Sequence, residues 1–335
     1  MLNMEQIVTE KTNDDDLMET ANLHLLSSDQ LRQIIRDYAT VHGVSFADIA
    51  IQSELGASTM SAWVNNKYLG SNVNIEEKVR KWIKARKAFN RQRDFVPHNG
   101  KFIVTGAAQK CLTVLEYAQS MPDIGVIVGE PGTGKTSTIR HYKANHPNVW
   151  LLTASPSVAQ HNVVLDALRE LMGIPLMRNY LTLRQIIAKT QGTQGLLIID
   201  EAQFLHPQAL DELRSIHDQA EVGLVFAGNQ EVWRQLDGGG QKAKFAQLHS
   251  RVGARVNLGR PNLRDIGDIL DAYEVLDKEQ RGLLRGIAQK PGGLRAMIKT
   301  LNLAYRVARG NGNELTAAHI SAAYGHRSGA LDVEA

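Results

Sequence analysis

The segment Gly129–Thr136 constrains this chain more than any other, because it fits the pattern G-x-x-x-x-G-K-[ST]. The apolar run Ile124–Val128 before it has the composition of a buried strand, and Ser137–Lys143 after it that of a helix. Glycines let such a loop curl so that its N–H groups point at phosphate oxygens, and the helix adds its positive end. The segment therefore predicts a loop that binds a nucleoside triphosphate, rather than a glycine-rich turn that matches by chance.

The residue types of this loop predict its contacts. Lys135 would reach the β- and γ-phosphates, and the hydroxyl of Thr136 would bind Mg²⁺. The predicted cofactors are therefore ATP and Mg²⁺. The residues predicted to contact the nucleotide are Gly129, Gly132, Thr133, Gly134, Lys135, Thr136 and Ser137.

Two adjacent carboxylates, Asp200 and Glu201, end the apolar run Leu196–Ile199. Ligands of open α/β sheets bind at the carboxyl ends of strands, so we expect both carboxylates beside the loop. Asp200 would hold Mg²⁺ through water, and Glu201 would orient and polarise the attacking water. By itself the pair could be a strand end followed by a helix cap; together with Lys135 it predicts hydrolysis of the triphosphate.

Polar residues further along the chain are candidates for completing this site. Asn229 follows an apolar run and could contact the γ-phosphate or the lytic water, or only cap the helix Gln230–Leu236. Arg251 and Arg255 flank the last strand, and either could reach a phosphate across a subunit boundary or form a surface salt bridge. Arg295 lies in the first turn of a helix, where a cation opposes the helix dipole. We therefore expect Arg295 to reach back toward the γ-phosphate.

Composition limits the class of protein. The chain has 335 residues, enough for two or three domains, and its net charge of +3 permits a nucleic-acid partner. A single cysteine, Cys111, excludes an intramolecular disulfide framework and favours a reducing compartment. No apolar run approaches the length of a membrane span. These features predict a cytoplasmic protein without a membrane segment.

Composition and the spacing of apolar residues divide the chain into five predicted parts. Residues 1–22 have the composition of a flexible acidic tail, and residues 23–95 the pattern of a small all-helical domain. Strands alternate with helices over 96–260, which predicts an α/β core with a parallel sheet covered on both faces. A helical domain over 261–328 and a tail at 329–335 would follow. The expected strands are Ile124–Val128, Val149–Thr153, Leu196–Ile199, Leu224–Ala227 and Ala254–Leu258.

The N-terminal domain contains a segment, Phe46–Asn66, that resembles a helix-turn-helix with Ala57–Asn65 as the recognition helix. Glu54 occupies the turn position that glycine usually holds, so the turn geometry could differ. The alternative is a small helical bundle used for protein contacts. The short polar residues predicted to touch phosphates or base edges are Ser58, Thr59 and Asn65.

Three further expectations concern the same domain. Ser28 is the expected cap of the first helix. Trp63 and Trp82 are expected in the core rather than stacked on bases. A helix over Ile75–Phe89 and the basic run that ends near Arg93 would supply much of the affinity for a DNA backbone.

Together these motifs resemble those of AAA+ ATPases, in which Asn229 corresponds to sensor 1, Arg251 to the arginine finger and Arg295 to sensor 2. The resemblance implies an AAA+ core with a helical C-terminal lid. More narrowly, from about Phe46 to its C-terminal helices, the chain is similar to the Mu B family of transposition proteins. The segments that carry this similarity are Asn66-Lys67-Tyr68, Asn148-Val149-Trp150, Thr190–Gly195, Ile198–Ala202, Ser250-Arg251 and Ile287–Pro291.

The narrower resemblance implies a protein that binds ATP and polymerises into helical filaments on double-stranded DNA, largely without sequence preference. It implies that the filament selects target DNA and presents it to a transposase, which stimulates ATP hydrolysis and so disassembles the filament. Basic residues after the second strand contact the DNA backbone in this family. Arg178 aligns best with such a contact, and Arg184 and Lys189 are further candidates that could instead lie on a solvated helix face.

Two other functions share part of these motifs. A helicase-loader-like ATPase would have a similar core and would act on a helicase, so a pull-down with transposase or helicase would separate it. A helix-turn-helix transcriptional regulator, or a DNA coat, would use ATP only as a ligand. Glu201 argues against this second alternative, because binding without hydrolysis needs no carboxylate to polarise water.

Overall fold

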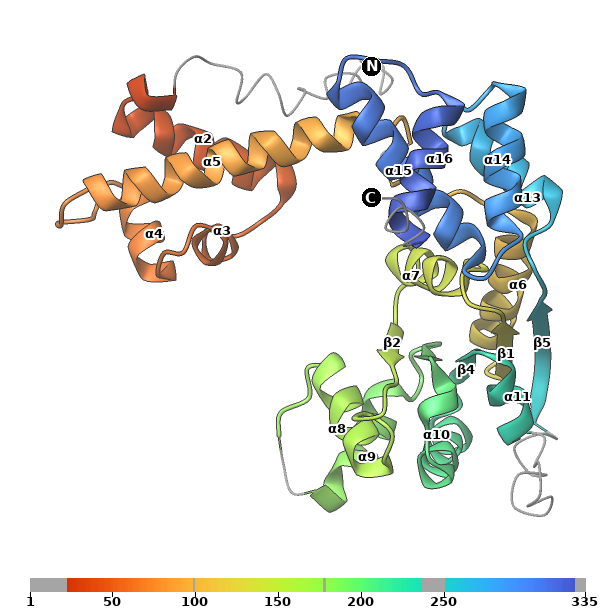
Figure 1. The fold of residues 1–335 in the computed structure, drawn as a ribbon. Helices are drawn as coiled ribbons and strands as arrows, with labels where there is room; N and C mark the ends of the chain where they lie inside the picture. Colours follow the sequence, from red (N-terminus) through yellow and green to blue (C-terminus); the bar gives the residue numbers. More distant parts are fainter. Residues whose placement is uncertain (1–22, 99, 177–178, 237–250, 329–335) are drawn as a thin grey trace, which may run out of the picture. The chain divides into compact units, whose positions relative to one another are not determined.

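The computed structural model describes residues 23–98, 100–176, 179–236 and 251–328 (Figure 1). The tails predicted at 1–22 and 329–335 therefore lie outside the described residues. The chain divides into two compact units, with the division after residue 99, and each unit has its own core.

The N-terminal unit is all-helical, as its apolar periodicity predicts. Leu31, Ile35, Ile49 and Val79 from three of its helices are fully buried or nearly so. Both tryptophans lie in this core, Trp63 with none of its surface exposed and Trp82 with 6% exposed, which confirms the expectation for them. The helices are η2 (Leu23–Leu25), α2 (Ser28–His42), α3 (Phe46–Gln52), α4 (Ala57–Val64) and α5 (Val73–Asp94).

The cap of α2 is Ser27 and not Ser28. The backbone N–H of Gln30 donates to Oγ of Ser27 (3.3 Å), and the Ser27 N–H donates to Oε1 of Gln30 (2.8 Å). This reciprocal pair requires a Gln or Glu three residues after the cap, and Leu31 stands there for Ser28. Ser28 instead begins the helix and donates its hydroxyl to Glu76 of α5.

The turn between α3 and α4 keeps the left-handed geometry although glycine is absent. Glu54 has φ +57°, in a region that costs a non-glycine residue about 1–2 kcal/mol. Lys78 of α5 donates to the Glu54 carbonyl oxygen (2.8 Å), and the ammonium of Lys81 lies 3.8 Å from its carboxylate. Contacts with α5 thus hold the turn that the sequence alone left in question.

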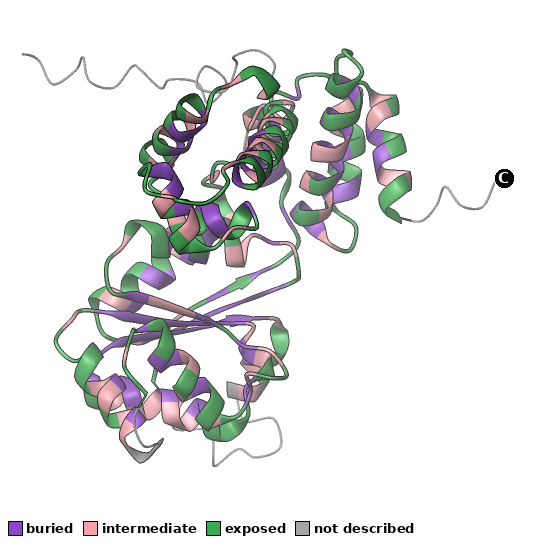
Figure 2. Cartoon of the chain, turned by 90° about the vertical axis from the view of Figure 1, so that its left-hand side faces the viewer, coloured by how far each residue is buried: buried purple, intermediate pink, exposed green. Residues whose placement is uncertain are grey.

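The C-terminal unit is built on a five-stranded parallel sheet in the order β2-β3-β4-β1-β5. Every residue of β1, β3 and β4 is buried, because helices cover both faces of the sheet (Figure 2). The expected strands and their parallel arrangement are thereby confirmed. The strands are β1 (Ile124–Gly129), β2 (Val149–Thr153), β3 (Leu196–Asp200), β4 (Gly223–Gly228) and β5 (Val252–Leu258).

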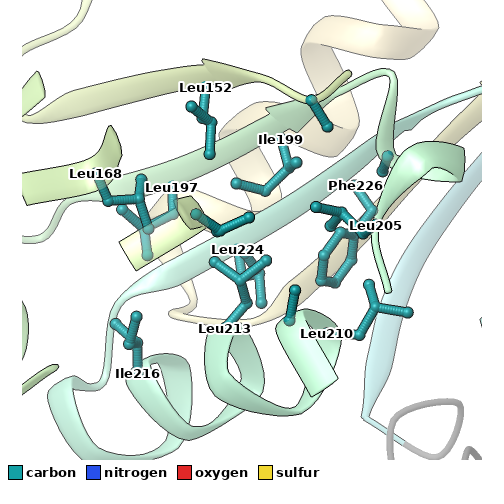
Figure 3. Close-up of a cluster of buried hydrophobic side chains, with 14 of the residues drawn as sticks. Leu152, Leu168, Leu197, Ile199, Leu205, Leu210, Leu213, Ile216, Leu224 and Phe226 are labelled. Atoms are coloured by element: carbon teal, nitrogen blue, oxygen red, sulfur yellow. The ribbon is translucent and has the colours of Figure 1, made fainter. Parts of the chain in front are cut away.

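Two apolar clusters hold the helices on the sheet. On one face, Ile127, Ile198 and Val225 pack with residues of α6 (Gly106–Ser120) and α7 (Lys135–Asn145). The other face, drawn in Figure 3, presents Leu197, Ile199, Leu224 and Phe226 to the remaining helices. Those helices are α8 (His161–Leu171), α9 (Asn179–Thr190), α10 (Pro207–Ala220) and α11 (Gln230–Leu236).

Four C-terminal helices complete this unit: α13 (Leu263–Ala272), α14 (Lys278–Ala288), α15 (Gly293–Gly310) and α16 (Ala317–Ser328). The buried carboxylate of Asp265 in α13 accepts hydrogen bonds from the backbone N–H groups of Gly106 (2.9 Å) and Ala107 (3.2 Å). Asp265, from the C-terminal helices, therefore satisfies two of the free backbone N–H groups at the amino end of α6. Across the described parts of both units, no helix is long and apolar enough to span a membrane.

Candidate nucleotide site

The loop after β1 has a backbone shaped for phosphate. Gly132 and Gly134 adopt φ values of +83° and +96°, which residues with a side chain rarely reach. The buried hydroxyl of Thr133 donates to the Glu130 carbonyl oxygen (2.9 Å) and closes the loop. Since α7 begins directly after Gly134, its positive N-terminal end opens at the loop. Ser137 is exposed in the first turn of α7.

The ammonium of Lys135 lies inside the loop. It donates to the carbonyl oxygens of Gly129 (2.8 Å) and Glu130 (3.0 Å). Burial lowers the pKa of Lys135 and the charge of Arg295 lowers it further, while Asp200 and Glu201 raise it. Because both partners are neutral carbonyls, an anionic γ-phosphate would form stronger, charge-assisted bonds with this ammonium.

Two oxygen ligands suited to Mg²⁺ lie side by side. Oγ1 of Thr136 donates to Oδ2 of Asp200 (2.8 Å), and Asp200 is 2% exposed at the end of β3. Burial raises the pKa of Asp200, and its hydrogen bonds from Thr136 and the Glu201 N–H lower it. Among the residues described, no group of three or more His, Cys, Asp or Glu could hold a metal. One hydroxyl and one carboxylate fit Mg²⁺, because this ion usually completes its coordination with phosphates and waters.

Glu201 follows Asp200 in a left-handed conformation, with φ +56° and ψ +37°. Its Oε2 accepts a hydrogen bond from Nε2 of Gln203 (2.7 Å), and Oε1 of Gln203 accepts one from the backbone N–H of Asn229 (3.3 Å). Sequence reasoning missed Gln203. The only signal was a side chain with both a donor and an acceptor two residues after the predicted base.

Asn229 stands where β4 ends and α11 begins. Its Oδ1 accepts from the Glu231 N–H (2.8 Å), which is the local bond of a helix cap. The backbone bond to Gln203 nevertheless keeps Asn229 beside the acidic strand end. Both roles weighed for this residue are compatible with its position.

Arg251 lies at the opposite end of the sheet from the phosphate-binding loop, Gly129–Thr136, of the same chain. It directly precedes β5, whose Val252 pairs with Ile124 and whose Leu258 pairs with Gly129. The distance along the strand from Arg251 to Leu258 is about 23 Å at 3.3 Å per residue. Nη1 of Arg251 donates to Oδ1 of Asp218 in α10 (2.6 Å), and the side chain is 46% exposed.

Arg255 does not flank the last strand as expected, because it lies within β5, where it pairs with Val126. Its guanidinium carbon lies 4.0 Å from the ring centroid of Trp233 in α11. Asp218, the partner of Arg251, also accepts a hydrogen bond from Arg214 of α10 (2.9 Å). Arg251 is thus held by an ion pair with Asp218, and Arg255 by a cation–π contact with Trp233.

The C-terminal helices contact the loop through backbone atoms. The N–H of Leu294, at the start of α15, donates to the carbonyl oxygen of Gly132 (3.0 Å). A Cβ added at Gly132 would lie 2.1 Å from the carbonyl oxygen of Gly292, so only glycine permits this approach. Exposed Arg295 follows directly, and its charge lowers the pKa of Lys135. Its contact with the γ-phosphate stays a prediction.

The predicted DNA contacts fall in both units. Arg178 lies outside the described residues, and Arg184 and Lys189 are exposed on α9. In the N-terminal unit Ser58 and Asn65 are exposed, and Thr59 is half-buried.

The basic run on α5 is partly structural. Nε of Arg80 donates to the Leu23 carbonyl oxygen (2.9 Å), and Nε of Arg86 donates to the hydroxyl of Tyr38 (2.7 Å). Lys84 and Arg91 are exposed on the same helix. Only part of the predicted basic surface is therefore presented to solvent.

Comparisons with known proteins agree with this geometry. A family model for an AAA domain matches residues 118–236, and one described as Mu B transposition protein, C terminal, matches residues 250–326. The ATP-dependent target DNA activator B of Escherichia phage Mu is 33% identical over 310 residues, which cover 91% of this chain and 95% of that protein. The protein of the same name from Escherichia phage D108 gives the same figures.

The Mu-like prophage FluMu DNA transposition protein B of Haemophilus influenzae is 32% identical over 261 residues, covering 77% of this chain and 90% of that protein. The parallel sheet, the phosphate-binding loop and the helical C-terminal part agree with an AAA+ fold and with ATPase activity of the AAA class. The chain belongs to the Mu B family of transposition proteins.

Proposed function

We propose that this protein is an ATP-dependent target-DNA activator that assembles as a helical filament on double-stranded DNA and activates a transposase. One observation supports assembly: Arg251 lies about 23 Å along β5 from Leu258, the residue that pairs with Gly129 of the phosphate-binding loop in the same chain. Because of this distance, Arg251 would contact a nucleotide phosphate bound by a neighbouring subunit and not one bound by its own loop. A contact between two different surfaces of identical chains repeats into a ring or a helix.

Hydrolysis in this proposal divides between two subunits. Lys135 would bind the phosphates; Thr136, and Asp200 through water, would hold a Mg²⁺ that supplies positive charge to them. Glu201 orients and polarises the attacking water. Arg251 of a neighbour stabilises the transition state, so assembly and hydrolysis depend on each other.

Contacts with the DNA backbone come from exposed cations and short polar groups. Arg184 and Lys189 on α9 serve in the ATPase unit, together with Arg178. Ser58, Thr59 and Asn65 of α4 and its end serve in the N-terminal unit, with Lys84 and Arg91 of α5 adding charge. Phosphate contacts of this kind give affinity with little sequence preference.

Phosphate release by the full chain tests this function. We expect duplex DNA to accelerate ATP turnover several-fold, and the transposase encoded by the same element to accelerate it further. Stimulation by a replicative helicase instead of the transposase would favour the loader-like alternative. ATP binding without turnover under every condition would favour a regulator or DNA coat.

Replacing Arg251 with alanine is expected to leave ATP binding intact and to lower DNA-dependent ATP turnover about 10³-fold, because an arginine finger contributes that much or more. Arg214→Ala is the matched control, since Arg214 shares the Asp218 carboxylate with Arg251. Arg255→Ala separates the second candidate. Turnover that survives Arg251→Ala but is lost in Arg255→Ala would transfer the role to Arg255.

A further inference from the structure

A continuous line of hydrogen bonds joins the phosphate-binding loop to the end of β4. Thr136 donates to Asp200, and Asp200 accepts from the N–H of Glu201 (3.0 Å). Gln203 then donates to the Glu201 carboxylate and accepts from the N–H of Asn229. Gln203 is the member of this line for which the mechanism above has no task.

The amide of Gln203 sits in a fitted niche. A Cβ added at Gly228 would lie 2.2 Å from Oε1 of Gln203, so the absence of a side chain at Gly228 makes the space that the amide fills. A separate bond, from Nε2 of Gln235 to the backbone carbonyl oxygen of Gln203 (3.0 Å), does not involve the amide. The amide therefore fits the space that the missing side chain of Gly228 leaves.

The orientation of this amide is determined by its partners. A carboxylate oxygen only accepts hydrogen bonds and a backbone N–H only donates them. Gln203 must therefore turn its NH₂ group toward Glu201 and its oxygen toward Asn229. A side chain that lacks either the donor or the acceptor cannot make both bonds.

We propose that Gln203 is a positioning residue for hydrolysis. Its amide fixes the position of the Glu201 carboxylate relative to Asn229, at the carboxyl end of β4. The inference rests on the proposed role of Glu201 in polarising water. Glu201 needs such support because its backbone is in a left-handed conformation and its side chain must meet a water at the γ-phosphate. Preorganised groups of this kind act in the transition state rather than in nucleotide binding.

Four variants of the full chain test this role at saturating duplex DNA. Gln203→Met keeps the size of the side chain and removes both hydrogen bonds. Gln203→Glu keeps the acceptor for the Asn229 N–H but places a carboxylate against Glu201. Gln203→His restores one donor and one acceptor, and Gln235→Met removes only the bond to the Gln203 carbonyl oxygen.

The expected result is a fall in kcat of about 10- to 100-fold for Gln203→Met and Gln203→Glu, because a misplaced reacting group costs up to that much. KM for ATP and the nucleotide dissociation constant should stay within about 2-fold, since the phosphate contacts are untouched. Gln203→His should recover most of kcat, and Gln235→Met should keep it. Thermal unfolding of each variant reports whether the loop still folds.

Two results would overturn the inference: a Gln203→Met protein with unchanged or higher kcat, or an equal loss in Gln235→Met. Glu201→Gln, measured alongside, separates this inference from the function it rests on. If Glu201→Gln retains turnover, the role of Glu201 fails; if it loses turnover while Gln203→Met does not, only the role of Gln203 fails.

Discussion

Replacing Lys135 with alanine is expected to abolish ATP-dependent binding to DNA. The ammonium bonds to two neutral carbonyl oxygens inside the loop, and anionic phosphates would be stronger partners for it. A hydrogen bond to a charged group contributes about 1.5–3 kcal/mol, so removing one such bond to a phosphate weakens ATP binding about 10- to 150-fold. Without bound ATP, the arginine of a neighbouring subunit has no γ-phosphate to bind.

Two measurements check this prediction: the affinity for a labelled nucleotide, and the retention of a labelled duplex with and without ATP. Lys143→Ala is the matched control, because Lys143 is an exposed lysine of the same helix α7. It should bind nucleotide and DNA as the unaltered chain does. Normal ATP-dependent complexes of Lys135→Ala with DNA would disprove the coupling between nucleotide and assembly.

Replacing Glu201 with glutamine is expected to lower ATP turnover by about 10²–10⁴-fold, the usual contribution of a positioned general base. Glutamine keeps the size of the side chain and an oxygen that can accept from Gln203, so ATP should still bind. Complexes with DNA should consequently persist longer than those of the unaltered chain, because hydrolysis is what ends them.

Phosphate release and the lifetime of DNA complexes after removal of free ATP measure both effects. Glu221→Gln is a matched control, since Glu221 is also a left-handed glutamate but is exposed at the end of α10. It should leave both quantities unchanged. Unchanged turnover in Glu201→Gln would remove hydrolysis by this residue from the mechanism.

Most of the fold could be predicted because local sequence determines it. Unbroken apolar runs such as Leu196–Ile199 become strands buried on both faces, and the loop after β1 carries its glycines where positive φ values occur. The predicted phosphate and Mg²⁺ ligands come from the same local pattern. The structure places Thr136 against Asp200, and their binding of Mg²⁺ stays a prediction.

Interactions between distant segments could not be predicted in this way. The Asp265 carboxylate reaches N–H groups of α6 that lie 159 and 158 residues earlier in the chain. Likewise, the bond from Leu294 to Gly132 requires the backbones at Gly132 and Gly292 to approach closely, and only the fold brings these two segments together. Arg251 and Arg255 could not be separated from sequence, because strand register and the partners Asp218 and Trp233 come from tertiary structure.

Local competition explains the smaller differences. Ser27 and Ser28 are equally good caps by residue type, and the Gln30 side chain decides between them. At the turn between α3 and α4, contacts with two lysines of α5 override the preference for glycine at Glu54. Neither outcome is visible from one position alone, because each depends on a partner elsewhere.

Electron microscopy of the full chain with duplex DNA, in ATP and separately in ADP, tests the central claim most directly. The claim is that ATP in the Gly129–Thr136 loop joins subunits along DNA. It predicts helical filaments on the duplex with ATP and bare duplex with ADP. Filaments of equal length in both nucleotides, or closed rings in place of filaments with ATP, would contradict it.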